Sequence, residues 1–357
     1  MASAINNGTF SFNPEELKDF SKVIHELVYG NEELRKIHDI QQGVFYDQQI
    51  VFAGKIGLMG KAVTGCAPNE IAGLDLTQKF WRPVREDFRL KHCSADVNAQ
   101  DKLVQQMARM NPDFYDVIEG SQGEIGSFLV AKVLEGFIEN LLRKIWFSDK
   151  LADTIDNGGE LTNGTDKGYF NTFDGLWKQI VANIPTTAAQ YVAAPRNGGA
   201  TYVAQELQDG DAIALLKAMY NKADSRLLGL TNKVFLVTRT VWDGYLNDLE
   251  SIQNSGAGNT MLNENGQMVL RYRGVEVINM EVWDRNIDSY YNDGTVRNKP
   301  NRAVLTVPTN IPVATLSEDD FGTVDAFYDK KEKSNYIDGI YTIDSKHLEN
   351  YLTVVSY

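Results

Sequence analysis

Glycines and a lysine between Gly54 and Thr64 are the first residues in the chain that could hold a phosphate group. A nucleotide-binding P-loop needs a glycine to open the loop and a serine or threonine after its lysine to bind magnesium. Here Lys55 occupies the first glycine position, and Ala62 follows Gly60–Lys61. The pattern therefore favours a flexible loop over a nucleotide site.

Two other sequence patterns associated with catalysis or cofactor binding are incomplete. Gly256–Ala257–Gly258 lacks the third glycine of a dinucleotide fingerprint, because Met261 stands in its place. No Gly-x-Ser-x-Gly nucleophile elbow occurs anywhere in the chain. The sequence therefore indicates neither a dinucleotide cofactor nor a serine hydrolase.

Metal-ligating residues are few and badly spaced. The histidines and cysteines are His25, His38, His92, His347, Cys66 and Cys93. No two histidines are four residues apart, as a zinc-binding helix requires, and the cysteines are 27 positions apart. We expect no metal and no cofactor, and we interpret both cysteines as free thiols in a reducing compartment, with a single disulfide as the alternative.

Acidic and aromatic residues leave one enzymatic alternative open. Four acids gather in a glycine-rich stretch, at Asp153, Asp156, Glu160 and Asp166. Their spacing does not fit a calcium-binding hand, so a solvated loop is favoured over a weak cation site. Carboxylate pairs for glycoside hydrolysis are available among 48 acids, and tryptophans could line a sugar cleft. The candidate tryptophans are Trp81, Trp177, Trp242 and Trp283. Core packing is the default for Trp177 and Trp242, which lie on predicted helix faces, and Trp81 and Trp283 are ambiguous between an interface and a core.

Composition and charge restrict the class of protein. The 357 residues suggest about two domains, and 43% hydrophobic against 23% charged residues is typical of a folded globular chain. The net charge of −13 disfavours a protein whose main role is to grip nucleic-acid phosphates. No signal peptide precedes the polar first residues, and no apolar stretch is long enough to span a membrane.

Hydrophobic periodicity predicts several helices. The clearest follows Ser121 and Glu124, which fit a capping box, and runs to Phe147 with apolar residues every three or four positions. The other predicted helices cover 13–30, 32–40, 99–110, 171–184, 211–222 and a segment from 240. Predicted strands cover 49–52, 80–90, 233–238, 268–272, 275–280, 303–307, 323–328, 336–343 and 352–355. Their irregular order indicates an α+β fold.

Five segments resemble the major capsid proteins of tailed phages, in particular phages of Bacteroidota. These segments are Phe80–Pro83 with Phe88–Leu90, Arg143–Asp149, Tyr169–Trp177, Tyr272–Val277 and Arg302–Thr306. The resemblance spans nearly the whole chain and rests on the order of the segments. It implies the Hong Kong 97-like fold, with an N-terminal arm, an extended β-hairpin loop, a peripheral domain with a long spine helix, and an axial domain.

The resemblance also implies a domain division and a function. The arm covers 1–42, the extended loop 43–96, the peripheral domain 97–150, the axial domain 151–335, and C-terminal strands returning to the peripheral domain 336–357. The chain is expected to assemble with itself into pentamers and hexamers of an icosahedral shell around double-stranded DNA. It would be a structural protein of the virion, made in the host cytoplasm, with a portal and with cement or scaffolding proteins as partners.

Interface residues are expected in the arm and the extended loop, where buried surface would come from other copies. The candidates are Leu17, Phe20, Ile24, Phe52, Phe80, Trp81, Arg82 and Arg85. Some family members cross-link a lysine of this loop to a neighbour, which makes Lys55, Lys61 and Lys79 candidates by location alone. An encapsulin-type shell is the alternative within the same fold, and a carboxylate-based glycan-active enzyme is the alternative outside it.

Overall fold

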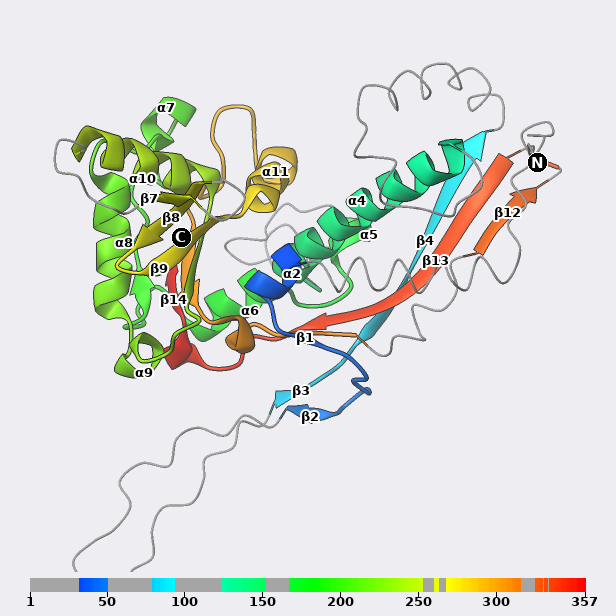
Figure 1. The fold of residues 1–357 in the computed structure, drawn as a ribbon, viewed down its shortest axis with the longest axis horizontal. Helices are drawn as coiled ribbons and strands as arrows, with labels where there is room; N and C mark the ends of the chain where they lie inside the picture. Colours follow the sequence, from blue (N-terminus) through cyan, green and yellow to red (C-terminus); the bar gives the residue numbers. More distant parts are fainter. Residues whose placement is uncertain are drawn as a thin grey trace, which may run out of the picture.

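The computed structural model describes residues 32–50, 79–93, 124–151, 167–252, 260–262, 268–315, 325–329, 331–332 and 334–357. They form a broad sheet covered by helices, a narrower sheet that extends away from it, and one long helix beside the narrower sheet (Figure 1). The predicted helices over 13–30 and 99–110, the central part of the glycine-punctuated loop, and the acidic loop lie outside the described residues.

The broad sheet has seven strands of mixed direction. Their order is β5 (Tyr191–Val192), β14 (Val354–Ser356), β10 (Ala303–Thr306), β6 (Val234–Val237), β9 (Val275–Asn279), β8 (Met268–Tyr272) and β7 (Thr260–Leu262). The pairs β14–β5 and β6–β9 are parallel, and the others are antiparallel. β6 and β10 are buried throughout, which is why both consist almost entirely of apolar residues.

Helices cover both faces of this sheet. On one face, α8 (Asp211–Lys222) and α10 (Arg239–Ile252) share an apolar core with Phe235, Val237 and Val277. On the other face, α6 (Leu176–Asn183), α11 (Glu281–Tyr290) and the end of the long helix share a core with Leu236 and Val304. Alternate strand residues therefore serve two separate cores.

Short elements complete this half of the molecule. They are α5 (Lys167–Phe170), α7 (Tyr202–Gln205), α9 (Ser225–Leu228), and the 3-10 turns η4 (Pro308–Asn310) and η5 (Asn350–Leu352). α2 (Glu32–Ile37) lies near η4 and contributes Leu34 and Ile37 to the second core.

The narrower sheet is built on β13 (Ser334–Ser345), which pairs with β4 (Val84–Cys93) over ten consecutive residues. β12 (Asp325–Asp329), β11 (Val313–Ala314) and β1 (Ile40–Gln41) complete it. A separate ribbon pairs β2 (Gln49–Ile50) with β3 (Lys79–Phe80). Segments distant in the sequence thus meet along β13.

The long helix α4 (Glu124–Phe147) has 24 residues, which corresponds to about 36 Å. It runs beside β4 and β13 (Figure 1). Phe137 of the helix contacts Phe88 of β4 and Tyr341 of β13, with ring centres 5.7 and 4.9 Å apart. Aromatic packing therefore fixes the helix to the sheet. In the described residues, no helix is both long and apolar enough to cross a bilayer.

Most predicted elements within the described residues are confirmed. The long helix ends at Phe147, α8 has the predicted bounds, and every strand predicted from 233 onward is present with ends shifted by at most two residues. The helix predicted from 171 starts only at Leu176. Gly175 is the N-cap in an extended conformation, and its amide donates to the Ser148 carbonyl at 2.7 Å, outside any helix.

Two features of the fold are not predicted by the sequence. β4, which falls within the predicted extended loop, pairs with β13 of its own chain. Helix α11 was not predicted, because only Trp283, Asn286 and Ile287 of its ten residues are buried and the apolar pattern is correspondingly weak.

Candidate functional site

Three large aromatic side chains are exposed within the predicted extended loop, two of them shortly before β2 and one in β3. Phe45, Tyr46 and Phe80 are 70%, 66% and 42% exposed. Backbone hydrogen bonds bring the two segments together, because the Asp47 amide donates to the Trp81 carbonyl and the Trp81 amide donates to the Gln48 carbonyl, each at 2.8 Å. We call Phe45, Tyr46 and Phe80 the ribbon patch. Exposed aromatic groups of this kind are typical of interaction surfaces.

Trp81 does not belong to this patch, contrary to the expectation of an interface residue. It is 1% exposed and packs in a small core with Val44, Ile50, Ala314 and Leu348. Strand alternation explains the difference, since neighbouring residues of an extended chain point to opposite faces. Phe80 therefore remains open while Trp81 anchors the ribbon to its own subunit.

The arginine candidates lie on exposed surface. Arg82 forms an ion pair with Asp47 at 3.1 Å, and its backbone amide donates to Asp344 at 2.7 Å. Arg85 is exposed on the face of β4 that points away from α4. Both are accessible to another molecule. The candidates Leu17, Phe20, Ile24 and Phe52 lie outside the described residues.

Lys79 is held by its own chain. Its ammonium group donates to the backbone carbonyls of His347 and Leu348. Burial lowers the pKa of Lys79, and the nearby Glu349 carboxylate partly opposes that shift. An amine bound to two carbonyls is poorly placed to attack an amide on a neighbour, so the structure disfavours Lys79 as a cross-linking residue. Lys55 and Lys61 lie outside the described residues.

A buried polar group joins α4 to the narrower sheet. Glu86 of β4 accepts hydrogen bonds from the Lys144 ammonium and the Tyr341 hydroxyl, and Glu86 and Lys144 are both buried. The Lys144 nitrogen also lies 4.9 Å from the ring centre of Tyr169. Burial, followed by the Glu86 charge, raises the pKa of Tyr341. This group is not predicted from the sequence, although the inward position of Glu86 on an alternating strand is a usable signal.

Tryptophans fill the core and do not line a cleft. Trp146, Trp177 and Trp283 form a triad with ring centres 4.6 to 5.5 Å apart, and all three are fully buried. The buried Arg302 guanidinium lies 5.4 Å from the Trp177 ring and donates to the carbonyls of residues 298 and 299. Burial lowers the pKa of Arg302 to about 10. Core packing, the default for the two helix tryptophans, is confirmed for Trp177, and Trp242 packs half-buried against the α8–α10 core. Trp81 and Trp283, which the sequence leaves ambiguous between an interface and a core, are both buried.

Two histidines are buried in structural roles. The Nε2 atom of His38 accepts from the Trp146 indole at 3.1 Å, and its Nδ1 donates to the Ile311 carbonyl at 2.9 Å. His347 lies between Asn183 and Thr353, at 3.1 and 2.9 Å. Across the described ranges, no group of three His, Cys, Asp or Glu side chains could hold a metal ion.

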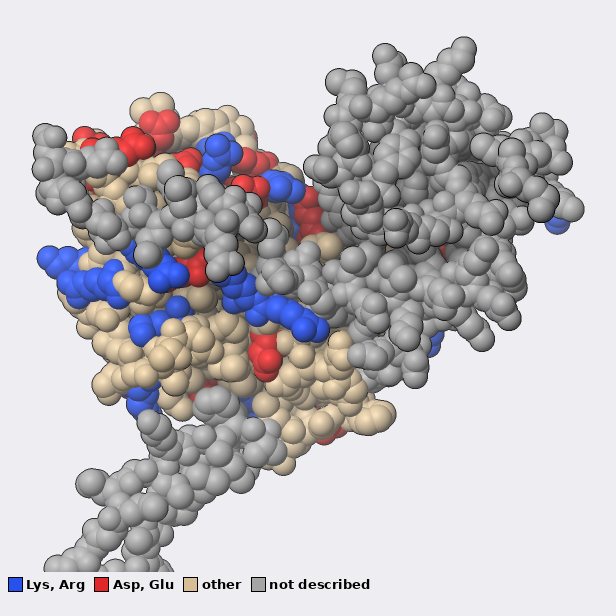
Figure 2. Space-filling model, viewed as in Figure 1, with Lys and Arg blue, Asp and Glu red and all other residues tan. Residues whose placement is uncertain are grey.

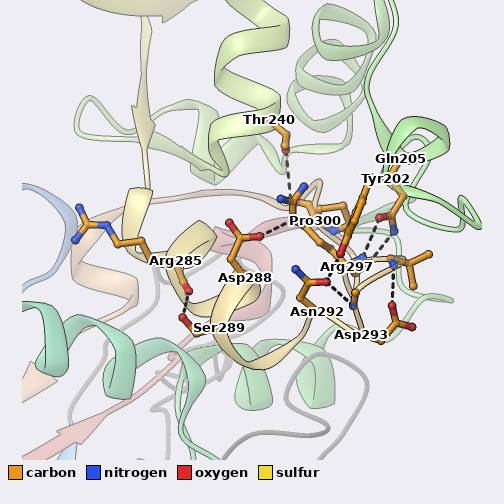
Figure 3. A network of polar contacts seen from close by, with 12 residues as sticks. Tyr202, Gln205, Thr240, Arg285, Asp288, Ser289, Asn292, Asp293, Arg297 and Pro300 are labelled. Atoms are coloured by element: carbon orange, nitrogen blue, oxygen red, sulfur yellow. Dashed lines mark hydrogen bonds and ion pairs between the residues drawn. The ribbon is translucent and has the colours of Figure 1, made fainter.

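The loop between α11 and β10 is held in one conformation by α7 (Figure 3). Gln205 donates to the Arg297 carbonyl at 2.7 Å and accepts from the Arg297 amide at 3.0 Å. Tyr202 donates to Asn292, and its ring lies 5.0 Å from the Arg297 guanidinium, which also pairs with Asp288. These hydrogen bonds and the ion pair fix the position of the loop relative to α7 and α11.

No protein-family model matches the sequence, and no curated protein matches it. Solved structures match most of the chain. A chain of the satellite phage P4 procapsid, in a structure that includes the size determination protein Sid, gives a TM-score of 0.55 at 9% identity, covering 98% of this chain and 92% of that one. A Gordonia phage Cozz chain gives 0.49 at 12% identity, covering 90% and 85%. A chain of the holo-SrpI encapsulin complex from Synechococcus elongatus gives 0.49 at 9% identity, covering 91% and 86%.

Of these three, the P4 procapsid chain exceeds a TM-score of 0.5, and the fold assignment rests on it. Nearly the whole of each chain is covered by this match. The chain therefore has the α+β, Hong Kong 97-like capsid fold that its sequence predicted.

Proposed function

We propose that this chain is the major capsid protein of a tailed phage, which assembles through rings of five and six copies into an icosahedral shell around double-stranded DNA. The observation that carries the proposal is the fold shared with a procapsid chain over 98% of this chain and 92% of that one. Fold alone does not determine function, so the surface of the chain supplies the second argument.

That second argument is the ribbon patch. Covering these three aromatic side chains would remove apolar surface from water, at about 25 cal/mol per Å². They lie within the segment predicted to be the extended loop, where a neighbouring copy is expected. A contact of modest strength is sufficient, because a closed shell repeats it in every copy.

We infer a revised domain division. The arm would cover 1–42 and the peripheral domain 97–150, with the axial domain at 151–335 and the returning strands at 336–357. The extended loop at 43–96 would be shorter than the sequence suggested, because β4 pairs with β13 and so belongs with the returning strands. The loop proper would then start after β2 and end before β3.

A structural role fits the site better than catalysis. The buried tryptophans and the fully engaged Lys79 supply neither a sugar cleft nor a free nucleophile. An encapsulin-type shell would be built through the same kind of contacts between copies. It would enclose protein cargo instead of DNA, and this difference distinguishes the two proposals. The portal, cement or scaffolding partners, the virion location and synthesis in the host cytoplasm follow from the capsid proposal and stay predictions.

Phe80→Ser tests the proposal, with Leu230→Ser as its control. Leu230 lies after α9 and is 37% exposed, close to the 42% of Phe80, so both variants remove a comparable apolar surface. We expect Phe80→Ser to slow or prevent the formation of rings and shells in size-exclusion chromatography and negative-stain microscopy, with unchanged circular dichroism. Equal assembly of Phe80→Ser, Leu230→Ser and the original chain would contradict the role of the ribbon patch.

A further inference from the structure

Large apolar side chains are exposed at few places in the described part of the chain. Three of them form the ribbon patch, and the others are Leu151, Tyr169, Val203 and Leu230. Apolar surface that stays exposed in one subunit is typical of a site that another molecule covers. Within the described ranges, these four side chains are therefore the candidates for the surface of a second copy that covers the ribbon patch.

Leu151 and Tyr169 lie on adjacent segments where the chain leaves the long helix. The Asp149 amide donates to the Phe170 carbonyl at 2.9 Å, so the residues after α4 run beside α5. Leu151 is two residues after Asp149, and Tyr169 is one residue before Phe170. Their side chains are 52% and 44% exposed. We call Leu151 and Tyr169 the helix-end patch.

Tyr169 is held in place for a contact with another molecule. Its ring packs on the buried ring of Phe170, with centres 5.2 Å apart, and lies 4.9 Å from the Lys144 ammonium. Arg143 and Glu139 form an ion pair on the same last turns of α4. An aromatic side chain beside charged groups is the composition of a protein interface, which has an apolar centre and a polar rim.

The other two candidates are less suited to cover an aromatic patch. Val203 is the exposed large apolar residue of α7, and Figure 2 shows Asp and Glu over α7 and α10. Leu230 follows α9 and is 37% exposed. Apolar side chains that stand singly on a surface are common in soluble proteins. The helix-end patch is therefore the better partner.

The two patches belong to different parts of one subunit. The ribbon rests on the small core that contains Trp81 and Leu348, whereas Tyr169 rests on Phe170 of the core shared by α4, α6 and α11. In the view of Figure 1, the ribbon lies below the narrower sheet and α5 lies above it. Both patches stay exposed, so neither covers the other within one copy.

We propose that the ribbon patch of one copy packs against the helix-end patch of a neighbouring copy. The inference rests on the proposed function, because it names the surface of the neighbour that covers the ribbon patch. A contact between two different patches is heterologous, and its repetition by rotation closes a ring. A contact between two ribbon patches would be isologous and would end at a dimer.

Cysteine cross-linking tests the contact without removing its apolar side chains. Gln49 is exposed and pairs with Phe80 across the β2–β3 ribbon, so the two side chains point to the same face. Lys150 is exposed and precedes Leu151. The test variant is Gln49→Cys/Lys150→Cys in the full-length chain, treated at assembly concentration with a short bismaleimide that joins two thiols.

The natural thiols are removed first, through Cys66→Ser and Cys93→Ser. Thr231 is exposed and follows Leu230, so Gln49→Cys/Thr231→Cys is the matched control. Circular dichroism checks that each variant is folded. Both single-cysteine variants are treated in the same way, because they report whether a patch meets its own copy.

We expect the test variant to give a ladder of covalent dimers, trimers and larger species on denaturing gels, because each copy contributes both reactive positions. The control and the single-cysteine variants should remain monomers. Dimers of the Gln49→Cys variant alone would show that ribbon patches meet each other, and would overturn the proposal. A ladder of equal yield in the control also overturns it.

Leu151→Ser gives a second measurement, with Leu230→Ser as its control. Leu151→Ser should raise the concentration at which rings form by about tenfold, whereas Leu230→Ser should leave it unchanged. Equal concentrations for both variants overturn the proposal.

Negative-stain microscopy of the same preparations separates this inference from the proposed function. Rings and shells without a ladder in the test variant overturn the inference and leave the capsid proposal standing. A ladder without rings or shells supports the contact and contradicts the capsid proposal. The absence of both contradicts both.

Discussion

At the scale of single residues, Gly339 shows how closely the narrower sheet is packed. It lies opposite Phe88 in the β4–β13 pairing, and a Cβ at this position would be 2.3 Å from two atoms of the Phe88 ring. The ring itself is packed against Phe137 of α4. The absence of a side chain at 339 therefore allows the aromatic contact between helix and sheet.

We predict that Gly339→Ala destabilises the chain by about 1–3 kcal/mol, because Phe88 must move away from Phe137. Gly198→Ala is the matched control, since its Cβ would meet nothing within 4 Å. Urea unfolding of the unassembled chain measures both. A destabilisation by Gly198→Ala as large as that by Gly339→Ala would show that the effect does not come from the Phe88 ring.

The buried histidines predict an acid-sensitive fold. Burial lowers the pKa of His38 from 6.5 to about 4, and burial with the nearby Lys79 charge lowers the pKa of His347 to about 3. Below pH 6.5 the unfolded chain binds protons that the folded chain excludes. The stability that the neutral histidines give the folded chain is therefore complete above pH 6.5 and is lost as the pH falls towards 4. Burial raises the pKa of Asp284 from 3.8 to about 6, which offsets part of the loss between those values.

His38→Gln provides the measurement. We expect this variant to be less stable than the original chain at pH 7.5, because the bond from Trp146 is weakened, and the difference should narrow at pH 5 as the original chain loses its histidine contribution. Urea midpoints at the two pH values give the comparison. A difference that is the same at both would mean that His38 does not titrate on unfolding.

At the scale of elements, the orientation of α4 against β4 depends on a buried ion pair. Lys144→Met leaves Glu86 charged, buried and bonded only to Tyr341, which should cost about 3–5 kcal/mol. Adding Glu86→Gln removes that charge and should recover most of the loss. Denaturant unfolding of both single variants and the double variant completes the cycle. Additive losses would show that the two side chains do not interact.

The elements themselves differ in how well sequence predicts them. α4 and α8 were predicted because each repeats apolar residues at helical spacing within one continuous segment. The pairing of β4 with β13 could not be predicted. The two strands are separated by about 240 residues, and the alternation of apolar and polar residues does not specify which strand pairs with which. α11 was missed because its buried face is narrow and contains Asn286.

The candidate site was only partly predictable for the same reason. Phe80 was expected at a surface and is exposed, whereas its neighbour Trp81 was expected there and is buried. The sequence identifies an aromatic pair, but which of the two points inward depends on the register of the β2–β3 ribbon. The contacts of Lys79 are equally unpredictable, because the carbonyls of His347 and Leu348 belong to the segment after β13, whose path depends on the tertiary fold.

At the scale of the whole molecule, two well-packed cores contrast with the exposed aromatic side chains of the ribbon patch. Apolar side chains fill both cores within one subunit, and the ribbon patch within the predicted extended loop stays exposed. This patch is the surface that the proposed assembly would cover.

Electron microscopy of the concentrated full-length chain tests that claim most directly. We predict rings, sheets or closed shells, in which the ribbon patch of one copy is covered by another copy. A chain that stays a 40.0-kDa monomer at every concentration and ionic strength would contradict it.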